Sequence, residues 1–251
     1  MYLKRILIAV IGLFVFQYAQ AGVDRTEMLQ DMAAFDRAYV AALALTSDQK
    51  QEPSRKSMAR LNTAWLTFRK RYQVSLGTDH KWRAGFAKID EQIRRADTIV
   101  TRATGLIEAH EALEEVRVIF MQLRRHDAIP YFPDALTAYH VPMEAIVLAA
   151  KGKTPQTLSD ADLATIVRTL PEAKKLWQEA IKIPVADDVF GFDPSRSQAV
   201  NAAIQQESEA LQKLEKALAT RDRALLIPAA VGIKPPFARL YKQFGDFSGL
   251  E

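Results

Sequence analysis

Cysteine is absent from the 251-residue chain. An exported protein of this kind is therefore held together without disulfides, and no thiolate is available as a metal ligand. The Cys-x-x-Cys-His attachment motif of c-type haem is excluded for the same reason, as is a lipid-modified cysteine after a signal peptide. Histidine is also scarce, with four residues in all.

Several motifs of enzymes and nucleic-acid-binding proteins are missing as well. The chain has no glycine-rich phosphate loop, no Gly-x-Ser-x-Gly elbow and no His-Glu-x-x-His helix. No block of five or six like charges suggests nucleic acid as a partner. The sequence therefore predicts no catalytic residue and favours a non-enzymatic protein.

Long hydrophobic runs are lacking except at the start of the chain. Lys4 and Arg5 precede the apolar run Ile6–Phe16, and Ala19–Ala21 supplies a small-x-small cleavage pattern. The run is eleven residues long, whereas a helix that spans a bilayer needs about 20. We therefore expect residues 1–21 to be a cleaved signal peptide and the protein to be periplasmic, with a retained N-terminal anchor as the alternative.

Cleavage before Gly22 changes the charge of the chain. The net charge is +4 for the whole sequence, with 34 basic and 30 acidic residues. Without Lys4 and Arg5, 32 basic residues face the same 30 acidic ones, so the mature chain carries +2. The basic character therefore comes partly from the signal peptide.

Helical periodicity follows in almost every segment, so the predicted fold class is all-α, an up-and-down helical bundle. Asp24 is suited to cap the first helix, whose apolar residues recur every three or four positions. These residues are Met28, Met32, Phe35, Tyr39 and Leu43. A single long helix is expected over 79–126, bent at Gly105. Pro142 predicts a kink or a new helix start near His140, and Pro171 predicts a break between two helices.

Residues 151–155, Lys-Gly-Lys-Thr-Pro, form the best candidate linker. They divide the mature chain into an N-terminal bundle half, 22–151, and a C-terminal half, 154–251. Segments 113–139 and 214–241 share a charged helix end, a proline-containing turn and a helix with Leu and Tyr. Two related halves produced by duplication are therefore one alternative.

Residues 106–150 hold three of the four histidines and are the best candidate site. His110 and Glu114, and likewise His140 and Glu144, are spaced i, i+4, so each pair projects from one face of a helix. Two such pairs on facing helices predict a metal site of two histidines and two glutamates. However, the rise of 1.5 Å per residue along an antiparallel hairpin places the pairs about 15 Å apart, too far to share one ion.

The same arithmetic brings other residues level with the second pair. His140 falls opposite Met121, and Glu144 falls opposite Arg117, where an ion pair would avoid leaving either charge half-buried and alone. We therefore interpret Arg117 and Glu144 first as a structural lock that holds the two helices together.

Met121 and His140 would also suit a b-type haem or a copper ion. In composition and fold class, an exported all-helical bundle without disulfides is similar to the periplasmic b-type and c′-type cytochromes, although no sequence motif is shared. The c′ type requires the absent cysteines. The b type requires only Met and His ligands, so the resemblance implies Met121 and His140 as the cofactor-binding pair.

A weaker cluster lies in the turn at 128–134 and its surroundings. His126, Asp127, Tyr131 and Asp134 supply nitrogen and oxygen ligands, but turns more often use Asp for local hydrogen bonds. His80, beside Lys81 at a helix start, is expected to be solvated. The leading hypothesis is an exported protein that binds a protein partner or a small ligand, and the alternative is a haem- or metal-binding bundle in electron transfer or metal handling.

Overall fold

The computed structural model describes residues 24–103 and 105–250. The predicted signal peptide, 1–21, and the expected mature start at Gly22 lie outside these residues. Within them the fold is all-α and without strands, which confirms the predicted class. The helices are α1 (Arg25–Ser47), α2 (Gln51–Tyr72), α3 (His80–Arg102), α4 (Leu106–His126), α5 (Phe132–Ala150), α6 (Asp160–Ala180), α7 (Asp187–Phe190), α8 (Pro194–Thr220), α9 (Arg223–Val231) and α10 (Lys234–Lys242).

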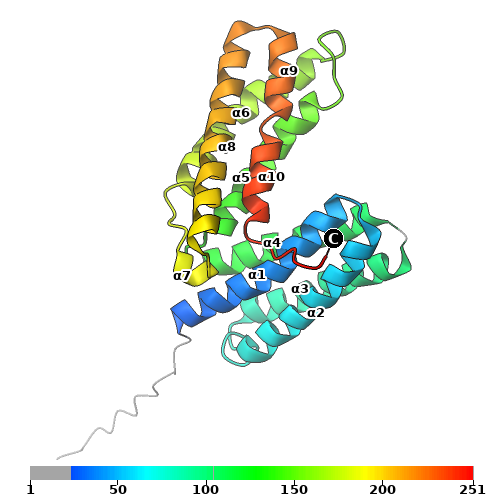
Figure 1. Ribbon diagram of the computed structural model, residues 1–251, viewed down its shortest axis with the longest axis vertical. Helices are drawn as coiled ribbons and strands as arrows, with labels where there is room; N and C mark the ends of the chain where they lie inside the picture. Colours follow the sequence, from blue (N-terminus) through cyan, green and yellow to red (C-terminus); the bar gives the residue numbers. More distant parts are fainter. Residues whose placement is uncertain (1–23, 104, 251) are drawn as a thin grey trace, which may run out of the picture.

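Helices α1 to α4 form an up-and-down bundle in which each helix packs on the next and α4 closes back on α1 (Figure 1). Asp24 caps α1 as predicted, accepting hydrogen bonds from the backbone of Thr26 and Glu27. The predicted apolar stripe of α1 is buried in full. Its central ring, Phe35, packs against aromatic side chains of α2 and α4. These are Trp65, Phe68 and Phe120.

The single long helix expected over 79–126 is wrong. The chain reverses between Arg102 and Leu106, and α3 and α4 pack along each other as a hairpin. Ala103 has a left-handed φ of 53°, which ends α3. Gly85 allows the close approach of the two helices, since a Cβ there would lie 2.6 Å from Cδ1 of Leu123. A very short connection therefore suffices for a reversal that the periodicity alone did not reveal.

A second up-and-down bundle contains α5, α6, α8 and a fourth position shared by α9 and α10, which follow one another along the same side (Figure 1). Because α5 packs chiefly along α6, the candidate linker at 151–155 is the loop of this hairpin. The helices group on either side of the turn at 127–131. The packing thus groups the helices differently from the predicted halves, 22–151 and 154–251.

The segments compared as a duplication also differ in structure. The turn after α8 falls at 221–222, so Pro228 lies inside α9, whereas Pro130 lies in the turn before α5. Helix α5 continues through Pro142, and α6 continues through Pro171, so the predicted break at Pro171 is wrong. Pro171 is exposed, as is Val167 one turn earlier. Water can therefore satisfy the carbonyl that the proline leaves free.

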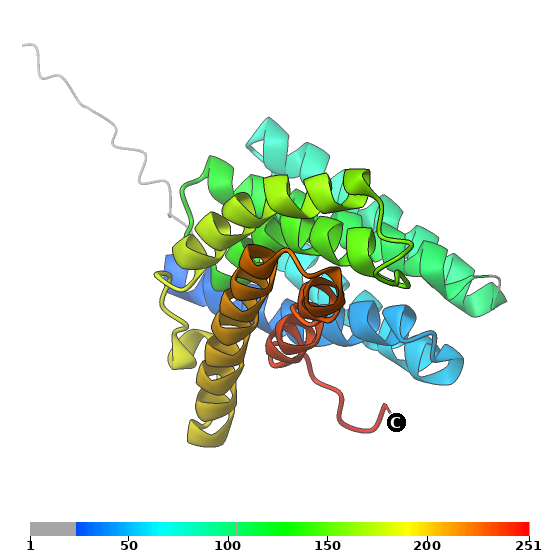
Figure 2. The same cartoon turned by 90° about the horizontal axis from the view of Figure 1, so that it is seen from above.

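The second bundle stands across the first, with α10 and the C-terminal segment returning to α1 (Figures 1 and 2). The backbone N–H of Asp246 donates to the carbonyl of Arg37 at 2.8 Å. Leu250 is buried against Ala41 and Leu45 of α1. The segment after α10 is therefore packed against α1. No helix in the described part of the chain is long and apolar enough to cross a membrane.

Candidate functional site: a polar cleft where the bundles meet

Helix α4 carries two buried arginines, Arg117 and Arg124, two turns apart on one face. Arg124 holds Asp134 at the start of α5 with two hydrogen bonds of 2.8 and 2.5 Å. Its guanidinium also lies over the ring of Tyr131, whose hydroxyl donates to Asp36 of α1 at 2.7 Å. Burial raises the pKa of Asp36 to about 6, although Arg124 opposes this shift. This network joins α1, α4 and α5 beside the turn between the bundles.

The turn cluster proposed from sequence is divided between two sides of the structure. Tyr131 and Asp134 belong to the buried network just described. His126 and Asp127 instead face α3, where Asp127 accepts a hydrogen bond from the indole of Trp82 at 2.6 Å. The four residues therefore do not converge on one point. His80 is exposed, as expected.

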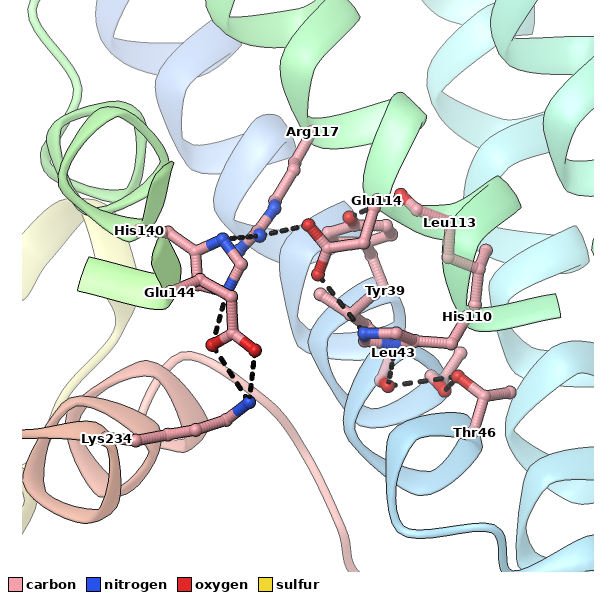
Figure 3. Close-up of polar contacts among 11 residues, drawn as sticks. Tyr39, Leu43, Thr46, His110, Leu113, Glu114, Arg117, His140, Glu144 and Lys234 are labelled. Atoms are coloured by element: carbon pink, nitrogen blue, oxygen red, sulfur yellow. Dashed lines mark hydrogen bonds and ion pairs between the residues drawn. The ribbon is translucent and has the colours of Figure 1, made fainter. Parts of the chain in front are cut away.

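Arg117 links the two bundles. Its side chain is only 6% exposed, and its guanidinium lies 5.5 Å from the ring centre of Tyr241 in α10. Nη2 contacts the carboxylate of Glu114, one turn earlier in α4, and lies 2.7 Å from Nδ1 of His140 in α5 (Figure 3). An arginine in a protein is always protonated and can only donate. The Nδ1 of His140 is therefore an acceptor without a proton.

This contact fixes the chemical state of His140. With Nδ1 accepting from Arg117, the ring's proton lies on Nε2. Burial lowers the pKa of His140 to about 3, and the positive charges of Arg117 and Lys234 act in the same direction. The Nε2–H lies 4.0 Å from the nearest oxygen of Glu144, which is beyond hydrogen-bond distance. His140 thus offers a neutral donor that Glu144 does not satisfy.

His110 lies two turns before Arg117 on α4. Its Nδ1 is 3.0 Å from the carbonyl oxygen of Leu43 in α1. Its Nε2 is 3.4 Å from Glu114 (Figure 3). Both ring nitrogens therefore face oxygen atoms, and the Glu114 carboxylate lies between an imidazole and a guanidinium.

The predicted lock between Arg117 and Glu144 is wrong. Arg117 pairs with Glu114 of its own helix, and Glu144 accepts from Nζ of Lys234 in α10, with both carboxylate oxygens at 2.9 Å (Figure 3). The prediction considered only the neighbouring helix in sequence. It could not show that the last helix of the chain packs against α5 and supplies the nearer cation.

These side chains surround a cleft of about 170 Å³ at the junction of α1, α4, α5 and α10. It is lined by Leu43, Ala44, Ser47, Asp48, His110, Glu114, Arg117, His140, Lys234, Phe237, Ala238, Tyr241 and Lys242. The neighbour of His140 on α4 is Arg117 and not the predicted Met121. Arg117 lies one turn closer to His110 along α4 than Met121 does. The structure therefore brings both histidines and Glu114 to one cleft, whereas Glu144 lies behind Lys234.

The arrangement does not suit the predicted haem or metal. A metal-bound imidazole donates its second N–H to an acceptor, whereas the second nitrogen of His140 accepts from a guanidinium. Met121 does not line the cleft. In residues 24–103 and 105–250, no three His, Asp or Glu side chains gather closely enough to hold a metal ion. The set His110, Glu114, His140 and Glu144 is thus not assembled as a metal centre, because Arg117 and Lys234 separate its members.

Sequence reasoning missed the contribution of α10. Five of its residues line the cleft at spacings of i, i+3, i+4, i+7 and i+8, which places them on one face of the helix. They are Lys234, Phe237, Ala238, Tyr241 and Lys242. The pairing of apolar rings with flanking lysines was visible in the sequence, but its partner helices were not. Comparison with family models, curated proteins and solved structures finds no match for this chain.

Proposed function

We propose that this chain is a non-enzymatic binding protein and that its ligand occupies the cleft between the bundles. The observation that carries the proposal is the Nε2–H of His140, which is held at the cleft by Arg117 and has no acceptor within hydrogen-bond distance among the described residues. This N–H is not among the buried polar atoms that lack a partner. It is therefore open to the cleft, where a ligand or water can accept from it. Small-molecule sites are concave and mostly apolar, with a few placed polar groups, and this cleft has that composition.

The state of the two histidines supports binding over catalysis. A general base needs an unprotonated nitrogen that faces the substrate. The lone pair of His140 at Nδ1 is taken by Arg117, and both nitrogens of His110 face protein oxygens. Neither of these rings is therefore poised to accept a substrate proton.

The proposed compartment is the periplasm. Its support is the pattern of a basic start, an apolar run and a small-x-small site in residues 1–21. A binding protein in that compartment meets small solutes directly, which agrees with a cleft of limited size.

A fragment screen by methyl NMR tests the binding proposal. Compounds of diverse chemistry are titrated while the methyl signals of Leu43 and Ala238 are followed. We expect saturable shifts for at least one compound class. In Ala238→Trp, which fills the cleft, we expect the shifts of Leu43 to be lost. Ala202→Trp, at an exposed position of α8, is the matched control and keeps the shifts. If no compound shifts the cleft signals, or if Ala238→Trp binds as wild type does, the proposal fails.

The haem or metal alternative has a separate test. Protein purified from its native compartment is examined by elemental analysis and visible absorption. We expect substoichiometric metal and no Soret band, because His140 does not offer a free lone pair. A stoichiometric metal or a haem spectrum would overturn the binding proposal in its present form.

A further inference from the structure

The charges around the cleft are unequal. Three side chains with a permanent positive charge line it, Arg117, Lys234 and Lys242. Two carboxylates, Asp48 and Glu114, also line it. Glu144 does not line the cleft but pairs with Lys234, and when it is included three carboxylates balance the three cations. Among the side chains that line the cleft itself, cations therefore outnumber carboxylates by three to two.

The three cations differ in how easily they can exchange partners. The Arg117–Glu114 pair is buried, so breaking it would leave uncompensated charge. The side chains of Lys234 and Lys242 are 44% and 41% exposed, and their partners are Glu144 and Asp48. Asp48 is 41% exposed and Glu144 is 24% exposed, and pairs in contact with solvent contribute about 0–1 kcal/mol each. The two lysines can therefore turn toward a ligand, while Arg117 stays in place.

His140 adds a hydrogen-bond donor, its Nε2–H, and the contact with Arg117 prevents this nitrogen from becoming an acceptor. Arg117 keeps the proton of the imidazole on Nε2, so the ring favours an acceptor and opposes a cation. Lys234 of α10 donates to Glu144 of α5, and the Nε2 of His140, also in α5, lies 4.0 Å from the same carboxylate. An oxygen acceptor placed beside Lys234 would thus meet a second donor from the neighbouring helix.

Apart from Ser47 and His110, the rest of the lining is apolar. Phe237 and Tyr241 stack with a ring separation of 6.0 Å, and Phe237 lies 5.6 Å from the ring of His140. Leu43 and Ala238 complete this surface. An apolar cavity of roughly 150 Å³ holds a molecule of the size of benzene. A cleft of about 170 Å³ therefore limits the ligand's apolar body to a short chain or a single ring.

We infer that the ligand is a small monocarboxylate with a short apolar body, which rests on the proposed binding function. Its carboxylate accepts from Lys234 and the Nε2–H of His140, which both lie beside Glu144. Lys242 adds positive charge from the other end of the α10 face, and the apolar body of the ligand lies on Phe237 and Tyr241. The ligand carboxylate takes the place of the Glu144 carboxylate at Lys234. Arg117 does not touch the ligand but orients His140.

Isothermal titration with matched pairs of compounds tests the inference. Butyrate and benzoate are compared at neutral pH with butyramide and benzamide, which have the same shape without the charge, and with inorganic phosphate, which has charge without an apolar body. We expect both carboxylates to bind at least tenfold more tightly than their amides and than phosphate. Binding weakens as salt is added, because the lysines are half-exposed.

Variants assign the contacts. Lys234→Gln and Lys242→Gln each weaken carboxylate binding several-fold, and the double variant weakens it at least tenfold. Lys175→Gln is the control, since Lys175 is 74% exposed on α6 and does not line the cleft. Circular dichroism melting confirms that each variant is folded.

The outcomes separate the two proposals. If the amides bind as tightly as the acids, or if phosphate competes equally, the ligand class is wrong while the cleft remains a binding site. The same holds if the fragment screen finds another class that saturates the cleft signals. If Lys175→Gln weakens binding as much as Lys234→Gln, the effect is general screening and the inference fails. If neither the screen nor the titration finds any ligand, the proposed function fails with it.

Discussion

The Nη2 of Arg117 lies 2.7 Å from the Nδ1 of His140, and this contact joins the fourth helix of one bundle to the first helix of the other. A permanent donor thereby determines which nitrogen of the imidazole carries the proton. The same arginine contacts Glu114 and the ring of Tyr241. The geometry of the cleft and the state of its histidine therefore depend on one buried guanidinium.

Replacing that guanidinium tests its structural role. Arg117→Met leaves Glu114 without its cation and removes the cation–π contact with Tyr241. We expect a loss of about 3 kcal/mol in the free energy of unfolding, the lower end of the range for breaking a buried pair, because Glu114 retains some exposure. Urea unfolding measures the loss. Arg125→Met, at an exposed position of the same helix, should change stability by less than about 0.5 kcal/mol, and equal effects of the two variants would contradict the prediction.

The state of His140 can be observed directly. Its pKa is lowered to about 3 by burial and by Arg117 and Lys234. Histidine-selective NMR should therefore show the Nε2–H tautomer unchanged from neutral pH to about 4. In Arg117→Met the pKa of His140 rises toward its usual value near 6.5. A wild-type ring that titrates near 6.5 would show that the contact with Arg117 is absent.

The same depressed pKa makes a prediction about stability. The unfolded chain protonates His140 below about pH 6.5, while the folded chain stays neutral, so stability is present above 6.5 and falls as the pH is lowered toward 3. Between these pH values His140 lowers the free energy of unfolding by up to about 1.4 kcal/mol for each unit by which the pH falls. His140→Gln removes that contribution. Urea unfolding of both proteins between pH 4 and 8 checks it, and parallel curves would refute it.

Glu207 gives a second pH dependence of opposite sign. Its side chain is fully buried in the second bundle, where it accepts from the hydroxyl of Tyr139, and its Oε2 has no hydrogen-bond partner in the described part of the chain. Burial raises its pKa to about 8. The folded state therefore holds the proton more tightly, so stability is fully present below about pH 4.5 and is lost as the pH rises through 8.

Glu207→Gln keeps the shape and removes the charge. It should be close to wild type in stability at pH 4.5 and more stable by a few kcal/mol at pH 9, an order-of-magnitude figure from the size of the pKa shift. Glu209→Gln, two residues away at an exposed position, should show no such change. Unfolding in urea at a series of pH values measures both, and a Glu207→Gln protein that is no more stable than wild type at pH 9 would contradict the assignment.

Gly85 tests the hairpin that the sequence did not reveal. A Cβ at this position would lie 2.6 Å from Cδ1 of Leu123, so Gly85→Val should destabilise the protein by about 1–3 kcal/mol through overpacking. Adding Leu123→Ala in the same chain should recover part of the loss. Ala84→Val, at the exposed position beside it, should cost much less. If Gly85→Val is as stable as Ala84→Val, α3 and α4 do not pack as described.

The local features of this fold follow from the sequence. Helix starts are set by side chains that reach only two or three residues, and the cap predicted at Asp24 is confirmed. Asp79, Ser159 and Asp193 cap later helices in the same way. The burial of Met28, Phe35 and their neighbours followed from helical spacing alone. Capping and periodicity act within a few turns, so neighbouring residues contain the information.

Direction and pairing across the fold were decided only by the tertiary structure. The reversal near Gly105 brings Gly85 against Leu123, which are 38 residues apart in the sequence, so local periodicity does not reveal it. The partner of Glu144 is Lys234 and not Arg117, because α10 returns to the junction after the whole second bundle has formed. The sequence by itself identified residues 106–150 as the informative stretch and determined helices, caps and stripes. The cleft exists only where four helices from distant parts of the chain meet, since the free energy of burying a charge depends on which partner the packing places beside it.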